Sequence, residues 1–526
     1  MKRRQSPVVG SPPPAPSPAG GLRLYLYVTA GITGAAIMIV EILGAKILAP
    51  WFGTSHFVWT AQIAVTLVAL AAGYYAGGRL VGKSSRLGRL YGAIVVAAAY
   101  LALAVALRES VAYFFLELPL AAGSLLSSAF LFFVPLSLLA MTGPFLVRVL
   151  TSSVNEVGGN VGRLTSISTM GSFLGTLAIG YVLIPLLPNS TTMYATAAVL
   201  AVIGLVYFLT WRRKASVLAA MAAVVSVGMA SAVGGMSSEA FRNPALVEVF
   251  RGNSNFGLLQ VLQQKDRPYR YFLTDYLIQN TYDATQGRSV SMFTYMLQGL
   301  ARAYTPRLER VLCIGMGMGI VPRELARAGA AVDVVEINPA VVPVARKYFD
   351  LDPGMFRLVI GDGRQFLNTS PGRYDAVILD AFNGDSSPSH LMTREAFAAI
   401  SRALNPDGVL VMNSFADVDP ANEFVAASLA RTLKSVFPSL RIHGIRGGNT
   451  LFVASPRAEL AFLHPPLFTD VHPDALDEVR SAFGTQWEPD PGHGIVLTDD
   501  HNPIEFYDAA NRERYRRSLA LSMRPR

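Results

Sequence analysis

Val311-Leu-Cys-Ile-Gly-Met-Gly-Met-Gly-Ile320 is the stretch of sequence that decides the fold of this chain. Its apolar first half predicts a short buried strand. Gly315, Gly317 and Gly319 permit a tight turn and let the backbone approach a ligand closely. A helix is expected directly afterwards, over Val321–Ala328, with its N-terminus at the same turn. Strand, glycine turn and helix in this order are typical of one unit of a doubly wound α/β sheet.

Two further strand patterns follow. Val332-Asp-Val-Val-Glu336 ends in an acidic residue, and Val359-Ile-Gly-Asp-Gly363 ends in Gly-Asp-Gly. A carboxylate in the place of Glu336 can accept hydrogen bonds from both hydroxyls of a ribose. A carboxylate in the place of Asp362, next to Gly363, can accept one from an adenine amino group. Together with the three glycines, these residues predict a site for an adenosine-containing cofactor.

A fourth strand pattern, Tyr374-Asp-Ala-Val-Ile-Leu-Asp380, ends in another acid. Because ligands of open α/β sheets bind outside the carboxyl ends of the strands, Asp380 is expected to face the cofactor. A polar loop follows, and its His390 is a candidate to close over a second substrate. The fifth strand is expected over Gly408–Phe415.

The rest of the chain is unusually apolar. Of its 526 residues, 52% are hydrophobic and 15% are charged, whereas soluble domains carry about 25% charged residues. Before about residue 235, apolar runs reach the ~20 residues needed to cross a bilayer. About seven such runs are expected, near Leu24–Leu48, Phe57–Gly78, Leu90–Leu107, Ala121–Val147, Thr165–Leu187, Met193–Trp211 and Ala215–Gly234. Pro135 and Pro144 predict a kink or break in the fourth.

The predicted fold class is a multi-span α-helical membrane domain, then a small antiparallel β-sheet, then a doubly wound, Rossmann-like α/β domain of the methyltransferase type. The expected divisions are a disordered proline-rich tail over 1–20, the membrane domain over 21–235, the small sheet with a helix over 236–305, and the α/β domain over 306–526. In the small sheet, strands are expected over Phe256–Gln263 and Tyr269–Gln279, followed by a helix over Ser289–Tyr304.

The net charge of +9 is concentrated in the N-terminal tail and in every second connection between apolar runs. By the positive-inside rule this pattern indicates membrane topology, with the N-terminus in the cytoplasm, and not a nucleic-acid footprint. We therefore expect a multi-pass protein of the cell membrane whose partner is the lipid bilayer. Seven crossings would place the α/β domain outside, whereas adenosyl cofactors are cytoplasmic, so the side of the membrane is left open.

Few residues outside the α/β motifs point to chemistry. The single cysteine, Cys313, lies in the middle of an apolar strand and is expected in the core. No His and Cys residues have the spacing of metal ligands, so we expect no metal site. Glu41 lies in the middle of an apolar run and is either a functional intramembrane acid or a partner of Lys46 or of a polar group on a neighbouring span.

Several of these motifs together resemble the spermidine synthase (polyamine aminopropyltransferase) family in its membrane-fused form. The likeness covers about residues 250–455 and rests on Phe272-Leu-Thr-Asp-Tyr-Leu-Ile-Gln279, Ile314-Gly-Met-Gly-Met-Gly319, Val335-Glu-Ile337, Gly361-Asp-Gly363 and Tyr374-Asp-Ala-Val-Ile-Leu-Asp380. Val40–Pro50 and Leu497–Glu505 also resemble the fused members.

The resemblance implies transfer of an aminopropyl group from decarboxylated S-adenosylmethionine to putrescine or a related polyamine. The products would be a spermidine-type polyamine and methylthioadenosine. By resemblance, Asp380 orients and deprotonates the amine, Glu336 holds the ribose, and Asp362 with Gly363 holds the adenine. The residues implied in acceptor binding are Gln279, Asp275 and Asp385.

The sequence departs from the family pattern in the half of the site that binds amines. Met318 stands where the family's glycine turn usually carries an acid, and Asn383 where the loop after the catalytic acid carries another. The family's Tyr-Gln pair is replaced by Phe256-Gly257, and its Tyr-His-Glu by Phe293-Thr-Tyr295. The cofactor half of the site thus matches the family, and the acceptor half does not.

Two alternatives to aminopropyl transfer remain. One is an S-adenosylmethionine-dependent methyltransferase acting on another acceptor, including a membrane-borne one, because the same sheet and acids would serve it. The other is a polyamine transporter or sensor without catalysis, which Glu41 and the long apolar region would favour. Whether the chain forms a homodimer is also left open.

Overall fold

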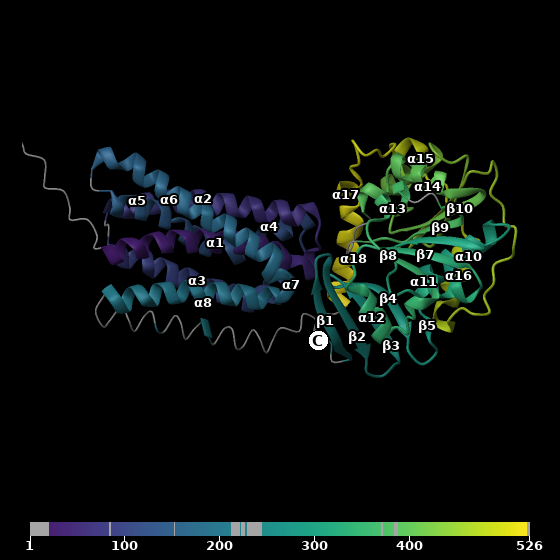
Figure 1. Cartoon of the computed structure of the whole chain (residues 1–526), viewed down its shortest axis with the longest axis horizontal. Helices are drawn as coiled ribbons and strands as arrows, with labels where there is room; N and C mark the ends of the chain where they lie inside the picture. Colours follow the sequence, from purple (N-terminus) through teal and green to yellow (C-terminus); the bar gives the residue numbers. More distant parts are fainter. Residues whose placement is uncertain are drawn as a thin grey trace, which may run out of the picture. The chain divides into compact units, whose positions relative to one another are not determined.

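The computed structural model describes most residues from 20 to 522 (Figure 1). The residues outside the description are 1–19, 84–85, 152, 212–220, 222–226, 229–242, 244, 370–371, 383–387 and 523–526. The tail expected over 1–20 therefore lies, except for Gly20, outside the described residues. The chain divides into two compact units, one covering residues 1–48 and 60–239 and the other covering 49–59 and 240–526.

Apolar helices, most of them long, make up the N-terminal part of the chain. They are α1 (Gly20–Phe52), α2 (His56–Lys83), α3 (Leu87–Phe115), α4 (Leu120–Ala140), α5 (Thr142–Leu150), α6 (Val157–Ala178), α7 (Ile184–Leu186) and α8 (Asn189–Trp211), with a π-helical turn at Ile179–Leu183. Six helical segments in the described residues are long and apolar enough to cross a membrane. They coincide with the first six expected runs, whereas the seventh, 215–234, lies almost wholly outside the described residues.

The fourth apolar run is broken by a proline. α4 ends at Ala140, Met141 lies in a turn, and α5 begins at Thr142. Pro144 has no N–H to donate to the carbonyl of Ala140, and its ring would clash with that carbonyl in a regular helix. The expected break is therefore found at Pro144, whereas Pro135 lies inside α4.

A five-stranded antiparallel sheet opens the second unit, with the strands in chain order. They are β1 (Leu246–Ser254), β2 (Gly257–Gln264), β3 (Tyr269–Thr274), β4 (Leu277–Asp283) and β5 (Arg288–Ser289). The prediction of a single strand over Tyr269–Gln279 was wrong, because that segment is a hairpin. Asp275 and Tyr276 have φ of 47° and 66°, and two consecutive positive φ values are typical of a two-residue hairpin turn.

The second sheet has seven strands in the order β11-β12-β10-β9-β6-β7-β8. They are β6 (Arg310–Ile314), β7 (Ala331–Glu336), β8 (Arg357–Ile360), β9 (Tyr374–Leu379), β10 (Leu404–Ser414), β11 (Ser439–Gly444) and β12 (Thr450–Ser455). β8, β7, β6, β9 and β10 run parallel. At one edge β12 pairs antiparallel with β10, and β11 pairs antiparallel with β12. From β6 the chain winds outward through β7 and β8, and then returns to the other side of β6 as β9. The order of strands thus reverses between β6 and β9, which is where such sheets bind their ligands.

Helices cover both faces of this sheet (Figure 1). They are α10 (Met292–Tyr304), α11 (Ile320–Arg327), α12 (Val341–Tyr348) and α16 (Pro473–Gly484) on one face, and α13 (Gly363–Thr369), α14 (Arg394–Ala403) and α15 (Phe424–Lys434) on the other. The chain ends in α17 (Ile504–Tyr507) and α18 (Ala509–Ser522).

The central position of β6 in the sheet explains why the stretch Val311–Ile314 is apolar throughout. Val311 and Cys313 belong to the core on one face of the sheet, and Leu312 and Ile314 to the core on the other. A central parallel strand is buried on both faces and so has no polar side. Cys313 is 1% exposed, and burial raises the pKa of its thiol, so it is a core residue that stays protonated.

Candidate active site

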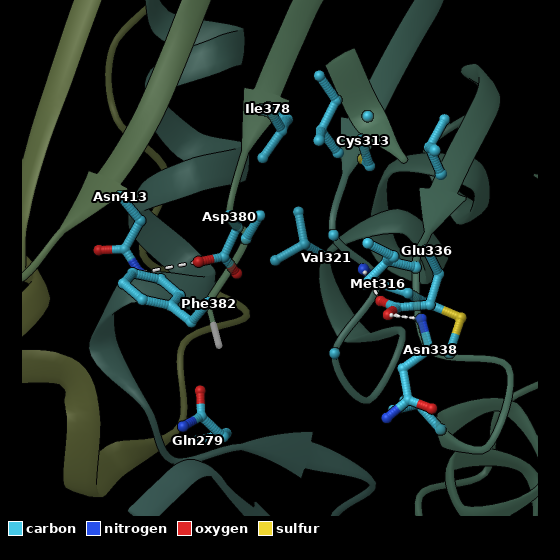
Figure 2. Close-up of a pocket in the computed structure, with 18 of the residues that line it drawn as sticks. Gln279, Cys313, Met316, Val321, Glu336, Asn338, Ile378, Asp380, Phe382 and Asn413 are labelled. Atoms are coloured by element: carbon cyan, nitrogen blue, oxygen red, sulfur yellow. Dashed lines mark hydrogen bonds between the residues drawn. The ribbon is translucent and has the colours of Figure 1, made fainter. Parts of the chain in front are cut away.

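A cavity lies at the point where the strand order reverses, at the carboxyl ends of β6, β7 and β9. Its lining includes the glycine turn after β6, Glu336 at the end of β7, Asp362 after β8 and Asp380 after β9. Figure 2 shows Glu336 and Asp380 on opposite sides of this space. The sequence predicted all of these residues as one site, and the fold places them together.

The glycine turn has the backbone that only glycine adopts easily. Gly315, Gly317 and Gly319 have φ of 93°, 52° and 74°. A Cβ on Gly315 would lie 2.1 Å from the carbonyl oxygen of Asp380, and one on Gly319 would lie 2.4 Å from Leu351. A Cβ on Gly317, by contrast, would meet no atom within 4 Å. Gly315 and Gly319 are therefore needed for packing, whereas Gly317 faces open space in which a ligand can approach the backbone.

Gly315→Ala is expected to lower the free energy of unfolding by roughly 3 kcal/mol, because it adds left-handed strain to a clash with fixed backbone. Gly317→Ala is the control, since its φ of 52° is also positive but a Cβ there meets no atom within 4 Å, and about 1 kcal/mol is expected. Thermal unfolding of the full chain measures both. Equal stability of the two variants would contradict the predicted contact between the glycine turn and Asp380.

Glu336 ties the end of β7 to the glycine turn. Its side chain is 8% exposed, and burial raises its pKa even though backbone N–H groups oppose this. One oxygen accepts a hydrogen bond from the N–H of Met316 at 2.9 Å and the other from the N–H of Asn338 at 2.8 Å (Figure 2). The carboxylate is therefore held in one orientation while it lines the cavity, as a group that binds a ribose must be.

Asp362 has a different environment. One oxygen accepts from the N–H of Gln365 at 2.8 Å at the start of α13, and the other lies 2.9 Å from Nε2 of His390. Burial raises the pKa of Asp362, but the Gln365 N–H and the His390 imidazole lower it by more, and it ends below its ordinary value. His390 thus pairs with the predicted adenine acid and not with Asp380. Beside Asp362, Gly363 packs against β6, since a Cβ there would lie 2.4 Å from Ile314.

Among the three cavity carboxyls Glu336, Asp362 and Asp380, Asp380 is the one whose pKa is raised by a large amount. Burial raises its pKa to about 6, against the opposing effect of a hydrogen bond from Asn413. The Asn413 amide donates to Asp380 at 2.9 Å (Figure 2). The Asn449 amide in turn donates to Asn413 at 2.9 Å. A carboxylate with this pKa is largely ionised at neutral pH and is still basic enough to take a proton.

The sequence analysis did not identify Asn413 and Asn449. Asn413 lies on β10, which pairs with β9 so that Met412 is level with Leu379. The next residue on each strand is then Asn413 and Asp380, side by side at the edge of the cavity. The order of the strands was needed to find this pair.

The three residues predicted to bind the acceptor have different positions. Gln279 on β4 lines the cavity below Asp380 in Figure 2. Asp275 lies in the β3–β4 turn, outside the cavity lining, and its carboxylate accepts from the N–H of Leu258 at 3.0 Å. Asp385 lies outside the described residues. Their roles remain predictions.

The donors for a metal site are not gathered in the described part of the chain. Among these residues, no group of three or more His, Cys, Asp or Glu side chains could hold an ion.

Comparison with known proteins confirms the resemblance in the α/β domain. Residues 291–443 match the family described as Spermine/spermidine synthase domain. A polyamine aminopropyltransferase of Vibrio vulnificus is 40% identical over 130 residues, which are 23% of this chain and 44% of that protein. An N-terminal histidine N-methyltransferase of Emericella nidulans is 30% identical over 216 residues, 37% of this chain and 38% of that protein.

Among solved structures, a spermidine synthase in complex with the transition-state analogue AdoDATO is similar at a TM-score of 0.37 and 22% identity, over 45% of this chain and 84% of that one. The chain spans less than half of the length of the two curated relatives described above.

Proposed function

We propose that this chain is a transferase that moves an aminopropyl group from decarboxylated S-adenosylmethionine to an amine. The observation that carries the proposal is the position of Asp380, an acid with a raised pKa of about 6, across the cavity from the ribose candidate Glu336. The match of residues 291–443 to the Spermine/spermidine synthase domain supports the reaction class. Putrescine or a related polyamine is the acceptor that the resemblance implies.

In the proposed reaction, the acceptor nitrogen forms a bond to the carbon next to the donor's sulfonium. The bond from that carbon to sulfur breaks, and its electron pair leaves with sulfur as neutral methylthioadenosine. The attacking nitrogen must be uncharged before it reacts. After the bond forms it is positively charged and must lose a proton. Asp380 attracts the amine, orients it and takes this proton, while Asn413 holds the carboxylate in place.

The donor would be held by the opposite side of the cavity. Glu336, oriented by two backbone N–H groups, would accept from the ribose hydroxyls, and Asp362, which also lines the cavity, would accept from an adenine amino group. Gly317 leaves room for the donor to approach the turn. These positions would leave the sulfonium between the glycine turn and Asp380.

Methyl transfer from intact S-adenosylmethionine is the second candidate, and Met318 favours it. Met318 is 3% exposed, lines the cavity, and offers no anionic partner for the terminal amine of the decarboxylated donor. The similarity to the N-terminal histidine N-methyltransferase of Emericella nidulans points the same way. In both candidates the donor contains adenosine. They differ in the group that is transferred to the acceptor, aminopropyl in the first and methyl in the second.

Calorimetric binding of the two donors and of methylthioadenosine to the full chain separates the candidates. Aminopropyl transfer predicts that the decarboxylated donor binds more tightly than S-adenosylmethionine and yields methylthioadenosine with an amine. Tighter binding of S-adenosylmethionine, with S-adenosylhomocysteine as product, would replace the first candidate by the second. Binding of neither donor would contradict both.

The pH dependence of transfer is expected to report the ionisation of Asp380. The active form of a base is the deprotonated one, so the rate should fall as pH drops through about 6, the pKa of Asp380. Asn413→Ala removes the hydrogen bond that lowers this pKa, so the fall should begin at higher pH, and the rate at pH 7 should drop by roughly 2- to 10-fold. Initial rates between pH 5 and 9 measure both. An unshifted profile in Asn413→Ala would show that Asp380 does not control it.

We further propose that the six apolar helices cross the lipid bilayer and make this a multi-pass protein of the cell membrane. Their length and apolar composition support this. The full chain is expected in the membrane fraction after washing with alkaline carbonate and in solution only after detergent is added. Release by carbonate alone would contradict the proposal.

A further inference from the structure

A segment near the end of the chain, Leu497–Asn502, contacts both the loop that carries His390 and the helix α13. Asp499 is at the centre of these contacts. One of its carboxylate oxygens accepts from the hydroxyl of Thr393 at 2.6 Å, and the other accepts from the guanidinium of Arg364 at 2.9 Å. The Thr393 hydroxyl and the Arg364 guanidinium hold the pKa of Asp499 below its ordinary value, so this carboxylate is ionised at neutral pH.

Arg364 links Asp499 to the cavity. It follows Asp362 by two residues in the sequence, and its guanidinium also donates to the backbone carbonyl of His390 at 2.8 Å. The imidazole of the same histidine lies 2.9 Å from Asp362. Because the pKa of Asp362 is lowered, its carboxylate is ionised and can only accept, so Nε2 of His390 is the donor in this bond. The contacts therefore form a closed ring that leads from Asp362 through Arg364 and His390 back to Asp362.

Two further hydrogen bonds hold the loop on both sides of His390. The N–H of Arg394 donates to the carbonyl of Leu497 at 2.8 Å. The side-chain amide of Asn502 donates to the carbonyl of Ser389 at 2.8 Å. His390 lies between these two points, in a single 3₁₀ turn. The C-terminal segment thus fixes the backbone from which the imidazole of His390 reaches Asp362.

The network ends on a carboxylate that can meet a ligand. Asp362 and His390 line the cavity, whereas Arg364 and Asp499 do not. With the N–H of Gln365 on one oxygen and His390 on the other, the carboxylate of Asp362 is held in one orientation. Each oxygen of a carboxylate can accept more than one hydrogen bond, so capacity remains for an amino group. A fixed acceptor of this kind favours an amino group over a carbonyl oxygen in the same place, because a carbonyl oxygen cannot donate to it.

We propose that Arg364 and Asp499 are positioning residues for the adenine end of the donor, which hold His390 against Asp362 and so fix the direction in which Asp362 accepts. The inference rests on the donor site of the proposed function and is the same for either transferred group. Asp499 lies outside residues 291–443, which match the family. The proposal gives a role to Leu497–Glu505, the C-terminal stretch that resembles the fused members.

Two nucleosides test the proposal by binding alone. Methylthioadenosine carries an amino group on C6 of the base, and 5′-methylthioinosine carries a carbonyl oxygen there. Each is titrated calorimetrically into the full chain, and the unchanged protein is expected to bind methylthioadenosine at least roughly tenfold more tightly. Asp499→Asn should lower this preference by roughly 3- to 10-fold, by weakening the binding of methylthioadenosine and not that of methylthioinosine. Asp500→Asn, at the exposed acid that follows, makes the same change of charge outside the cavity lining and should alter neither affinity.

A double-mutant cycle tests whether Asp499 acts through His390. His390→Ala should itself lower the preference for methylthioadenosine. If Asp499 acts by positioning this histidine, adding Asp499→Asn to His390→Ala should cause no further loss. Losses that add in the double variant would show that Asp499 acts by another route and would overturn the proposal.

The side chain of Asp499 is 52% exposed, so its substitution is expected to leave the fold intact. Arg364→Gln removes the bond to the carbonyl of His390 directly and should give the same pattern as Asp499→Asn. An unchanged preference in both variants, or equal weakening of both nucleosides, would refute the positioning role and leave the transferase standing. Binding of neither nucleoside by the unchanged protein would refute the donor site itself, and this inference with it.

Discussion

Asp380→Asn is expected to abolish transfer, lowering kcat by ~10²- to 10⁴-fold, the range for removal of a general base. The amide keeps the shape of the carboxylate, and its oxygen can still accept from Asn413. It cannot take a proton or attract a cation. Binding of methylthioadenosine should therefore remain within about twofold of the unchanged protein, because no part of the adenosine is held by Asp380 in the proposed mode.

Asp375→Asn is the matched control for this experiment. Asp375 lies near the start of the same strand, β9, where its carboxylate accepts from the N–H groups of Glu309 and Arg310 and from Asn405. It is not part of the cavity lining. This variant should affect stability and leave kcat of the folded protein unchanged. Transfer that survives Asp380→Asn would mean that another group accepts the proton.

Glu336→Gln is expected to weaken binding of methylthioadenosine by roughly 10²-fold, the effect of losing charge-assisted hydrogen bonds of about 1.5–3 kcal/mol. Both oxygens of Glu336 accept from backbone N–H groups, those of Met316 and Asn338. In glutamine an NH₂ group replaces one oxygen, and this group would face a backbone N–H from which it cannot accept a hydrogen bond. The glycine turn should then be held less firmly, and the ribose loses its anionic acceptor.

Calorimetry with methylthioadenosine measures the loss, and Glu324→Gln is the control. Glu324 is a surface glutamate on α11 that pairs with Arg323 and Arg327 and does not line the cavity. The same change of charge there should leave affinity unaltered. If Glu336→Gln binds methylthioadenosine as tightly as the unchanged protein, the donor does not use the end of β7.

Local patterns were sufficient to predict which residues meet at the glycine turn. Gly315, Gly317, Gly319 and Glu336 lie within one strand–turn–helix–strand unit, so their spacing along the chain already determines where they meet. Asp380 could be predicted for a related reason, since the carboxyl ends of parallel strands share one edge.

The rest of the site could not be predicted in the same way. Asn413 lies next to Asp380 only because β9 and β10 are neighbours in a particular register. His390 follows Asp380 in the sequence, but the fold brings its side chain to Asp362. The turn at Asp275 and Tyr276 has positive φ at both residues without the glycine that usually fills the second position of such a turn. The positions of Asn413 and His390 thus depend on contacts between segments that are distant in sequence, whereas the turn is local but lacks its usual sequence signal.

The contact between Gly315 and the carbonyl of Asp380 has a consequence for redesigning this site. A Cβ at Gly315 would lie 2.1 Å from that oxygen, so the glycine turn and the backbone of Asp380 are packed directly against each other and positions 315 and 380 cannot be varied separately. Phe256, Phe293, Phe382 and Phe415 lie instead in turns, at the start of a helix or in loops after strands. A combinatorial library that diversifies these four positions and keeps 315 and 380 fixed would change the lining of the cavity without disturbing this contact.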